Sequence, residues 1–224
     1  MKILAVDTAT ISCSVAVIDK ETLLAESTMV RQQTHSKHLM GMIDYIVGLS
    51  GLAISELDGF AVTSGPGTFT GLRIGMSAIK GLAMATGKPV VGVSSLDALA
   101  MQAAPSPYLI CPLIDARREE VYFSTYKFEG GYLKRQMNES VMPPEDVVKY
   151  LDEPCVFLGS GALLYQKMLK QMMNKTACFI PPFKGTIKAS TVAYLSMYDF
   201  ESDDTDDIKT LVPYYIRKPD AEMA

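Results

Sequence analysis

Hydrophobic residues in the first part of the chain form short continuous runs separated by polar turns, which is typical of buried strands. The run 3–6 ends at Asp7, and a turn rich in Thr and Ser separates it from a second run at 13–18. This spacing predicts a hairpin, and a third strand is expected at 23–29. Two later runs, 59–63 and 89–93, predict further strands.

Two segments of the same region have apolar residues at helical spacing instead. Leu39, Ile43, Ile46 and Val47 predict one helix over about 37–49. A second helix is expected from about residue 70 to residue 86, where Gly87-Lys88-Pro89 would end it. A strand meander followed by alternating helices and strands indicates an α/β fold with a mixed sheet.

The pattern is partly repeated after the Pro-containing segment 103–107, which we interpret as a domain boundary. The run 108–114 ends at Asp115, just as the first run ends at Asp7. Such a duplication is the arrangement of the actin, sugar-kinase and Hsp70 superfamily. We therefore predict two actin/Hsp70-like (ASKHA) domains, each a mixed sheet with flanking helices. They are expected at 1–103 and, in reduced form, at 104–211, with the tail 212–224 packing back on the first domain.

Composition narrows the class of protein. The 224 residues carry a formal net charge of -4, and Lys and Arg look scattered, without the basic stripe of a free-standing nucleic-acid binder. The four cysteines are far apart in the sequence, which favours reduced thiols. The N-terminal apolar run is too short for a signal peptide or a membrane span, so we expect a cytoplasmic protein without membrane contact.

The glycine-rich turn 64–73 lies between a predicted strand and a predicted helix, an order in which backbone N–H groups often meet an anion. Its spacing fits neither common phosphate motif. A P-loop needs glycine where Thr70 stands, and Gly65, Gly67 and Gly71 are one residue too widely spaced for GxGxxG. Gly65 and Gly67, with Asp7, remain a candidate nucleotide site, and a sharp turn around Pro66 is the alternative.

Other chemistry has little support in the sequence. The two histidines, His35 and His38, have no further His or clustered Cys to complete a zinc site. There is no GxSxG motif. An actin-like ATPase or kinase would need Asp7 and Asp115 to hold Mg-ATP, and a glycoprotease-like peptidase would need a nucleophile and base that we do not find. We assign no catalytic residue and no metal ligand.

The second predicted helix has small residues at spacings of three and four: Gly71, Gly75, Ala78, Gly81 and Ala85. Each interior glycine costs about 1 kcal/mol relative to alanine, and close packing would compensate. The pattern fits packing on the protein's own sheet, or contact with a helix of another subunit.

Several segments together resemble the TsaB (YeaZ) family over nearly the whole chain: 3–10, 34–39, 64–73, 89–96, 115–122 and 213–222. The Gly-Pro-Gly-x-Phe-Thr-Gly-Leu-Arg element is shared by TsaB and its catalytic paralogue TsaD. The metal-binding histidines of TsaD correspond to Ser95 and Leu99 here, and these side chains are unsuited to hold iron or zinc.

The resemblance implies a non-catalytic scaffold or activating subunit for N6-threonylcarbamoylation of adenosine 37 in tRNA (t6A37). It implies a heterodimer with TsaD, a ternary complex with TsaE, a homodimer in isolation, and contact with tRNA only through the complex. ATP and a metal would belong to the partner subunits, and no cofactor is assigned to this chain. A homodimer with some separate binding role is a further alternative.

The resemblance also places the partner interface on the helices 37–49 and 70–85 of the first domain. The residues expected there are His38, Met42, Tyr45, Ile46, Leu72, Gly75, Met76, Ala78, Ile79 and Leu82.

Overall fold

The computed structural model describes residues 1–30 and 35–217. The chain forms two compact units. The first contains residues 1–95 and 187–214, and the second contains 96–186 and the described residues from 215 onward. Each unit has its own mixed sheet and its own hydrophobic core.

The sheet of the first unit has five strands in the order β3-β2-β1-β4-β5. A meander of antiparallel strands comes first: β1 (Lys2–Asp7), β2 (Ser12–Asp19) and β3 (Thr22–Val30). The strands β4 (Gly59–Gly65) and β5 (Val90–Ser94) extend it in parallel with β1. These strands confirm the elements predicted from the hydrophobic runs.

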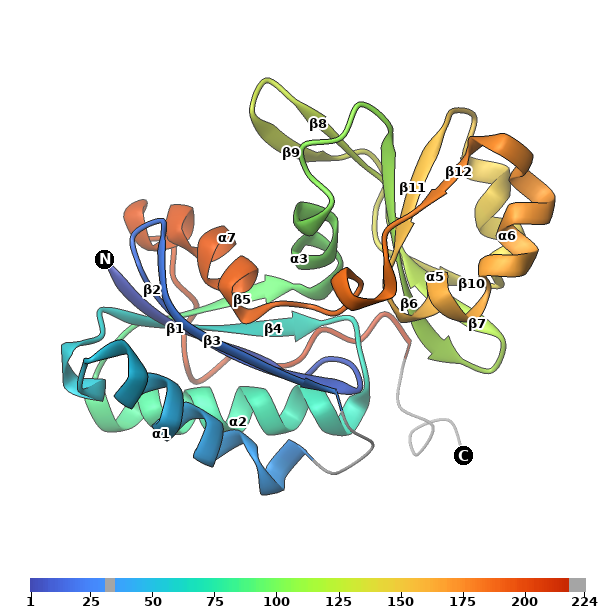
Figure 1. Ribbon diagram of the computed structural model, residues 1–224. Helices are drawn as coiled ribbons and strands as arrows, with labels where there is room; N and C mark the ends of the chain where they lie inside the picture. Colours follow the sequence, from blue (N-terminus) through green and yellow to red (C-terminus); the bar gives the residue numbers. More distant parts are fainter. Residues whose placement is uncertain (31–34, 218–224) are drawn as a thin grey trace. The chain divides into compact units, whose positions relative to one another are not determined.

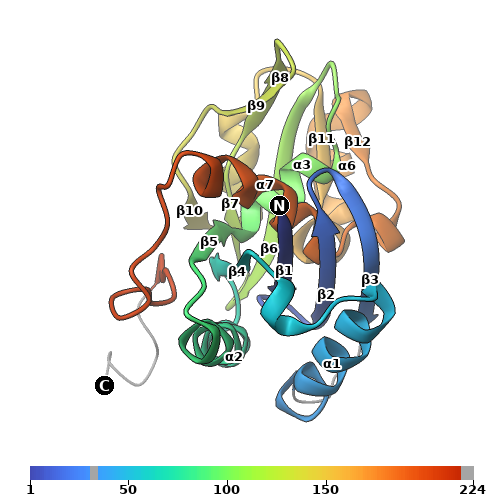
Figure 2. The same cartoon turned by 90° about the vertical axis from the view of Figure 1, so that its left-hand side faces the viewer.

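Helices cover both faces of this sheet (Figure 1). α1 (Leu39–Ser50) and α2 (Phe69–Thr86) pack on one face, and α7 (Ala189–Glu201) packs on the other. Figure 2 shows α1 and α2 side by side beneath the sheet. Short 3-10 helices precede and follow α1: η1 (His35–Lys37) and η2 (Ile54–Glu56).

α7 corrects the predicted domain boundaries, which placed residues 104–211 together. Its first turn is held by the first sheet: the Ala189 N–H donates to the Ser14 hydroxyl at 3.0 Å, and the Ser190 N–H and hydroxyl donate to the Glu26 carboxylate at 2.9 and 2.7 Å. Both faces of a twisted mixed sheet need an apolar cover, and α1 and α2 cover only one. α7 supplies the second cover from late in the sequence.

The segment 206–214, here called the C-terminal strap, also belongs to the first unit. The Asp206 N–H donates to the Val90 carbonyl at 2.9 Å beside the edge strand β5. Leu211 is buried in the core, and its carbonyl accepts a hydrogen bond of 3.0 Å from Lys80 Nζ on α2. Of the predicted tail, the part up to Tyr214 thus lies in the first unit. Residues 215–217 lie in the second unit, and 218–224 are outside the described residues.

The second unit has a seven-stranded sheet with the path β10-β7-β6-β11-β12, and β8 and β9 form a hairpin beside β6. The strands are β6 (Leu109–Arg117), β7 (Glu120–Phe123), β8 (Tyr126–Glu129), β9 (Tyr132–Arg135), β10 (Ser140–Met142), β11 (Cys155–Leu158) and β12 (Ala177–Phe179). The helical segments are α3 (Ser95–Gln102), α4 (Pro144–Val147), η3 (Val148–Tyr150), α5 (Ser160–Leu164), α6 (Gln166–Met173), η4 (Asn174–Thr176) and η5 (Pro182–Lys184).

Almost all of α3 belongs to this second unit, whereas the sequence placed residues up to 103 in the first domain. Its Asp97 carboxylate accepts two hydrogen bonds from the Arg135 guanidinium at the end of β9: Nη2 donates to Oδ2 at 2.8 Å, and Nε donates to Oδ1 at 3.3 Å. Such bidentate pairs hold two elements in a fixed orientation. Among the described helices, none is long and apolar enough to span a membrane.

Candidate functional site

The glycine-rich turn after β4 lies directly on the turn that follows β1. The Thr8 hydroxyl donates to the Gly71 carbonyl at 2.7 Å. A Cβ atom added to Gly71 would strike the Thr8 carbonyl oxygen, one on Gly75 would strike the Thr8 hydroxyl, and one on Gly67 would strike the Ala9 carbonyl oxygen. Gly67, Gly71 and Gly75 therefore allow α2 and the turn before it to lie against the end of β1.

Gly65 makes room for the C-terminal strap. Its φ is +132°, a value that L side chains rarely adopt, and an added Cβ would strike the Tyr214 carbonyl oxygen. The Tyr214 N–H also donates to the Ser64 carbonyl at 2.7 Å. The backbone of the protein thus occupies the space beside Gly65 and Gly67. This arrangement argues against the predicted nucleotide role of these glycines and favours the alternative of a sharp turn.

Asp7 ends β1 inside the protein, with no solvent-exposed surface. Its Oδ1 accepts hydrogen bonds from the Ala9 N–H at 3.0 Å and the Thr63 hydroxyl at 2.9 Å. Among the described residues its Oδ2 has no hydrogen-bond partner. Burial raises the pKa of Asp7 from 3.8 to about 7, although the hydrogen bonds from Ala9, Thr63 and Ser12 lower it. A carboxylate enclosed in this way has no access to a magnesium–phosphate complex.

Asp115, the corresponding acid of the second unit, has a local structural role. One carboxylate oxygen accepts from the Arg117 N–H at 2.9 Å, and the other lies 3.3 Å from Arg117 Nη1. These contacts fix the β6–β7 turn. Neither acid therefore supports the ATPase alternative.

The outer side of α1 and α2 carries the strongest signal for binding. We call this surface the docking face. Large apolar side chains on it reach into solvent, with Tyr45 63% and Met84 74% exposed. Small residues lie among them, and a Cβ on Gly41, Gly48 or Gly81 would contact nothing within 4 Å. The docking face consists of Met40, Gly41, Met42, Tyr45, Gly48, Leu49, Ser77, Ala78, Gly81, Leu82, Met84 and Ala85.

A hollow of about 580 Å³ opens between the first turns of the two helices. The Arg73 guanidinium carbon lies 3.6 Å from the centroid of the Phe69 ring, which is within cation–π distance. The hollow is lined by Ser36, Leu39, Met40, Phe69, Thr70, Arg73, Ile74, Ser77 and Ala78. It gives the otherwise convex pair of helices a concave, mainly apolar point of contact.

The predicted interface residues divide into two groups. Tyr45 is exposed, and His38, Met42, Ala78 and Leu82 are partly exposed, so all five can meet a partner. The other five are corrected by the structure, because α1 and α2 turn them toward the sheet, where they are buried. They are Ile46, Leu72, Gly75, Met76 and Ile79.

Of the docking face, the sequence interpretation missed Met40, Gly41, Gly48, Leu49, Ser77 and Met84, and it noted Gly81 and Ala85 without placing them at the interface. The apolar positions that define the buried side of each helix were a usable signal. A helical wheel that fixes Ile43 and Val47, or Leu72 and Ala83, toward the sheet places these residues outward, except Met40, which it places beside Val47.

The positions expected from the resemblance to correspond to the TsaD metal ligands are enclosed in protein. Ser95 is fully buried, and its hydroxyl has no hydrogen-bond partner among the described residues. Leu99 is 1% exposed in the second unit. Within 1–30 and 35–217, no three His, Cys, Asp or Glu side chains gather in a way that could hold a metal ion.

Comparison with known proteins identifies the family. A family model described as "TsaD: tRNA N6-adenosine threonylcarbamoyltransferase" matches residues 22–224. The "tRNA threonylcarbamoyladenosine biosynthesis protein TsaB" of Bacillus subtilis (strain 168) is 30% identical over 225 residues, which cover 99% of this chain and 96% of the relative. The chain belongs to the TsaB family. The match to the TsaD model agrees with the expectation that TsaB and TsaD are paralogues.

Solved structures agree with this membership and with the predicted fold. YeaZ from Pseudomonas aeruginosa superposes with a TM-score of 0.82 at 29% identity, covering 96% of this chain and 99% of that one. The activator of 2-hydroxyisocaproyl-CoA dehydratase from Clostridium difficile reaches a TM-score of 0.56 at 11% identity, covering 91% and 98%. This second likeness concerns the fold alone. It supports the two actin/Hsp70-like domains predicted for this chain.

Proposed function

We propose that this member of the TsaB family is a non-catalytic subunit in t6A37 modification of tRNA, and that it acts by binding TsaD and, in a ternary complex, TsaE. Its TsaB relatives are named for tRNA threonylcarbamoyladenosine biosynthesis, which supports the reaction assigned. The buried Ser95 and Leu99 support a division of labour in which TsaD provides the metal site.

The docking face is the observation that carries the proposal. Gly48 and Gly81 lie inside helices and face solvent, where each costs about 1 kcal/mol relative to alanine and supports no packing within the first unit. Small residues between exposed Met and Tyr side chains let the backbone of a partner helix approach closely while the large side chains fill pockets on either side. Packing against a helix pair of a partner would thus offset the helix stability that these exposed glycines cost.

The same face also suits a homodimer. In an isologous pair, α1 and α2 of two copies form a four-helix contact in which each residue meets the partner's matching surface. A paralogue with similar helices would use the same geometry. We therefore expect the homodimer and the TsaD heterodimer to compete for the docking face.

The first test places a large cation in the middle of this face. Gly81→Arg is expected to weaken capture of TsaD at least tenfold, because a buried interface tolerates an unpaired charge poorly. The variant should fold as well as the unchanged chain, since nothing lies within 4 Å of its Cβ and arginine favours helix more than glycine does. The measurement is a titration of immobilised TsaD.

Tyr132→Arg is the matched control. Tyr132 is 73% exposed at the tip of the β8–β9 hairpin in the second unit, so the change adds the same charge away from the docking face. It should leave capture unchanged. Equal binding by the Gly81→Arg variant and the control would show that TsaD binds elsewhere.

The second test concerns the reaction. In a reconstitution with TsaD, TsaE, substrates and unmodified tRNA, omission of this chain is expected to lower t6A formation by at least tenfold. The chain alone should form none. Formation of t6A by the chain without TsaD, measured by mass spectrometry of digested tRNA, would overturn the non-catalytic assignment.

A further inference from the structure

One long segment of the chain contains no acidic residue. All 25 Asp and Glu residues lie outside 154–198, which covers β11, α5, α6 and β12 and extends into α7. The segment still contains lysines at 167, 170, 175, 184 and 188. In a protein with a net charge of -4, this is a marked local excess of positive charge.

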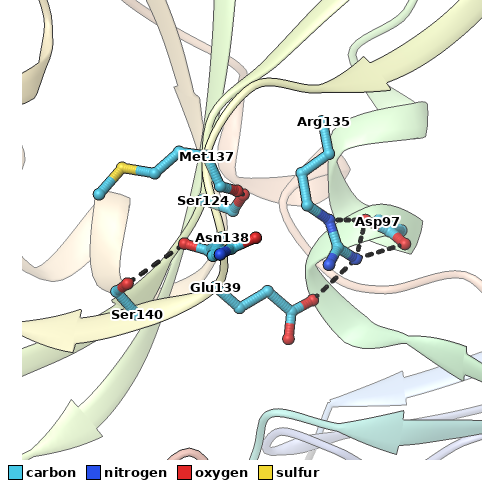
Figure 3. A network of polar contacts seen from close by, with 7 residues as sticks. All are labelled: Asp97, Ser124, Arg135, Met137, Asn138, Glu139 and Ser140. Atoms are coloured by element: carbon cyan, nitrogen blue, oxygen red, sulfur yellow. Dashed lines mark hydrogen bonds and ion pairs between the residues drawn. The ribbon is translucent and has the colours of Figure 1, made fainter.

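Several basic residues of the second unit that precede this segment are paired with carboxylates. Arg135 is held between Asp97 and Glu139, at 2.7 and 3.1 Å (Figure 3). Lys127 pairs with Glu153 at 2.8 Å. The neighbouring carboxylates largely neutralise these positive charges. Further pairs join Lys134 to Glu129, Lys149 to Asp146 and Arg117 to Asp115.

Lys167, Lys170 and Lys175 differ from them. Within the described part of the chain, none of the three has an ion-pair partner. Lys170 Nζ lies 5.3 Å from the centroid of the Phe179 ring, and all three side chains belong to exposed residues. Their charges are therefore available to a partner.

The three lysines follow one another along α6 and η4. Lys167 and Lys170 are three residues apart, so they lie on the same side of α6, about 4.5 Å apart along its axis. Lys175 follows shortly after the end of α6, in η4. Exposed uncharged polar residues accompany them: Gln171, Asn174 and Thr176.

Neighbouring elements add little negative charge. α4 packs against α6 and brings Glu145 and Asp146, but Asp146 is already paired with Lys149 at 2.5 Å. Lysines with amide and hydroxyl side chains beside them are the residue types that contact phosphate and sugar in nucleic-acid complexes.

We propose that Lys167, Lys170 and Lys175 form a basic face that binds the phosphate backbone of folded RNA. The choice of RNA among polyanions rests on the proposed function in tRNA modification. The contact is independent of base sequence, because lysine side chains on a short helix recognise phosphates as point charges. The chain would then touch tRNA directly, and not only through its partners.

The test is a fluorescence anisotropy titration of an unmodified tRNA transcript with the full chain, at several KCl concentrations from about 50 to 200 mM. The variant Lys167→Gln/Lys170→Gln/Lys175→Gln is expected to bind at least tenfold more weakly at the lowest salt. Three lost phosphate contacts should also reduce the slope of log affinity against log salt by about 2 to 3. Glutamine retains good helix propensity, so the fold is expected to persist.

The matched control is Lys127→Gln/Lys134→Gln/Lys149→Gln, which removes three ion-paired lysines from the same unit. It should leave tRNA affinity and salt slope within twofold of the unchanged chain. No binding by the unchanged chain at about 50 mM KCl, or equal loss in both triple variants, would overturn the proposal. Binding of the basic face to anionic vesicles but not to tRNA would overturn it as well.

TsaD capture by the basic-face variant separates this inference from the proposed function. The variant should capture TsaD normally, because its changes lie outside the docking face. If the basic-face variant binds tRNA as well as the unchanged chain does and still captures TsaD, only the proposal of the basic face is contradicted. Failure of the unchanged chain to capture TsaD would instead contradict the proposed function.

Discussion

The Asp7→Asn variant is expected to lose a large pH-dependent contribution to the stability of the first unit. In the folded protein, burial raises the pKa of Asp7 from 3.8 to about 7. The folded state therefore keeps a proton that the unfolded chain releases between these two values. The contribution of Asp7 to stability is greatest below pH 3.8, falls as the pH rises toward 7, and is constant above it.

A difference of roughly 3 pKa units corresponds to about 4 kcal/mol in the free energy of unfolding. Asparagine retains an oxygen that can accept from Ala9 and Thr63, but it has no proton to lose. Urea unfolding between about pH 4 and pH 8 should show the variant gaining stability relative to the unchanged chain as the pH rises.

Asp44→Asn is the control, because it removes an exposed carboxylate from α1 of the same unit. Its unfolding free energy should follow that of the unchanged chain across the range. If the Asp7→Asn curve is parallel to that of the unchanged chain as well, Asp7 is not a protonated buried acid at neutral pH.

Gly71→Ala is expected to destabilise the first unit by about 3 kcal/mol. The added methyl group would strike the Thr8 carbonyl oxygen, and separating α2 from this turn would also weaken the hydrogen bond between the Thr8 hydroxyl and the Gly71 carbonyl. For a chain of this size, the melting temperature should fall by about 8 °C. Differential scanning calorimetry is the measurement.

Gly81→Ala on the same helix provides the opposite expectation. Its Cβ would meet nothing within 4 Å, so the gain in helix propensity should stabilise the protein by about 0.5 to 1 kcal/mol. Two glycines of the same small-residue pattern would thus give opposite changes in stability when each is replaced by alanine. Destabilisation by both changes to a similar extent would mean that the buried and exposed sides of α2 are wrongly assigned.

The hydrophobic runs were sufficient to predict the five strands of the first sheet and its two large helices. Each of these elements has a regular buried side in the core of the first unit, so its periodicity shows directly in the residues. The small-residue stripe of α2 was visible too. The stripe has two parts in the structure: Gly71 and Gly75 lie against Thr8, whereas Gly81 and Ala85 face solvent. This division depends on how the helix is rotated on the sheet.

The sequence did not predict in the same way which sheet a distant helix would pack against. α7 has its own helical pattern, but nothing in that pattern says which sheet it covers. α5 and α6 were not predicted, because each is short and a tertiary core fixes it more than local propensity does. The lysines of α6 looked scattered in the sequence. In the structure they have no ion-pair partner among the described residues, whereas other basic residues of the second unit are paired with carboxylates.

The C-terminal strap has a consequence for the order in which the protein is made. β1, the middle strand of the first sheet, is translated well before α7 and the strap that complete this unit, and residues 96–186 of the second unit lie between them in the sequence. Contacts that join such distant parts of a chain form late and slowly. The first unit therefore stays incompletely covered while residues 96–186 of the second unit are synthesised.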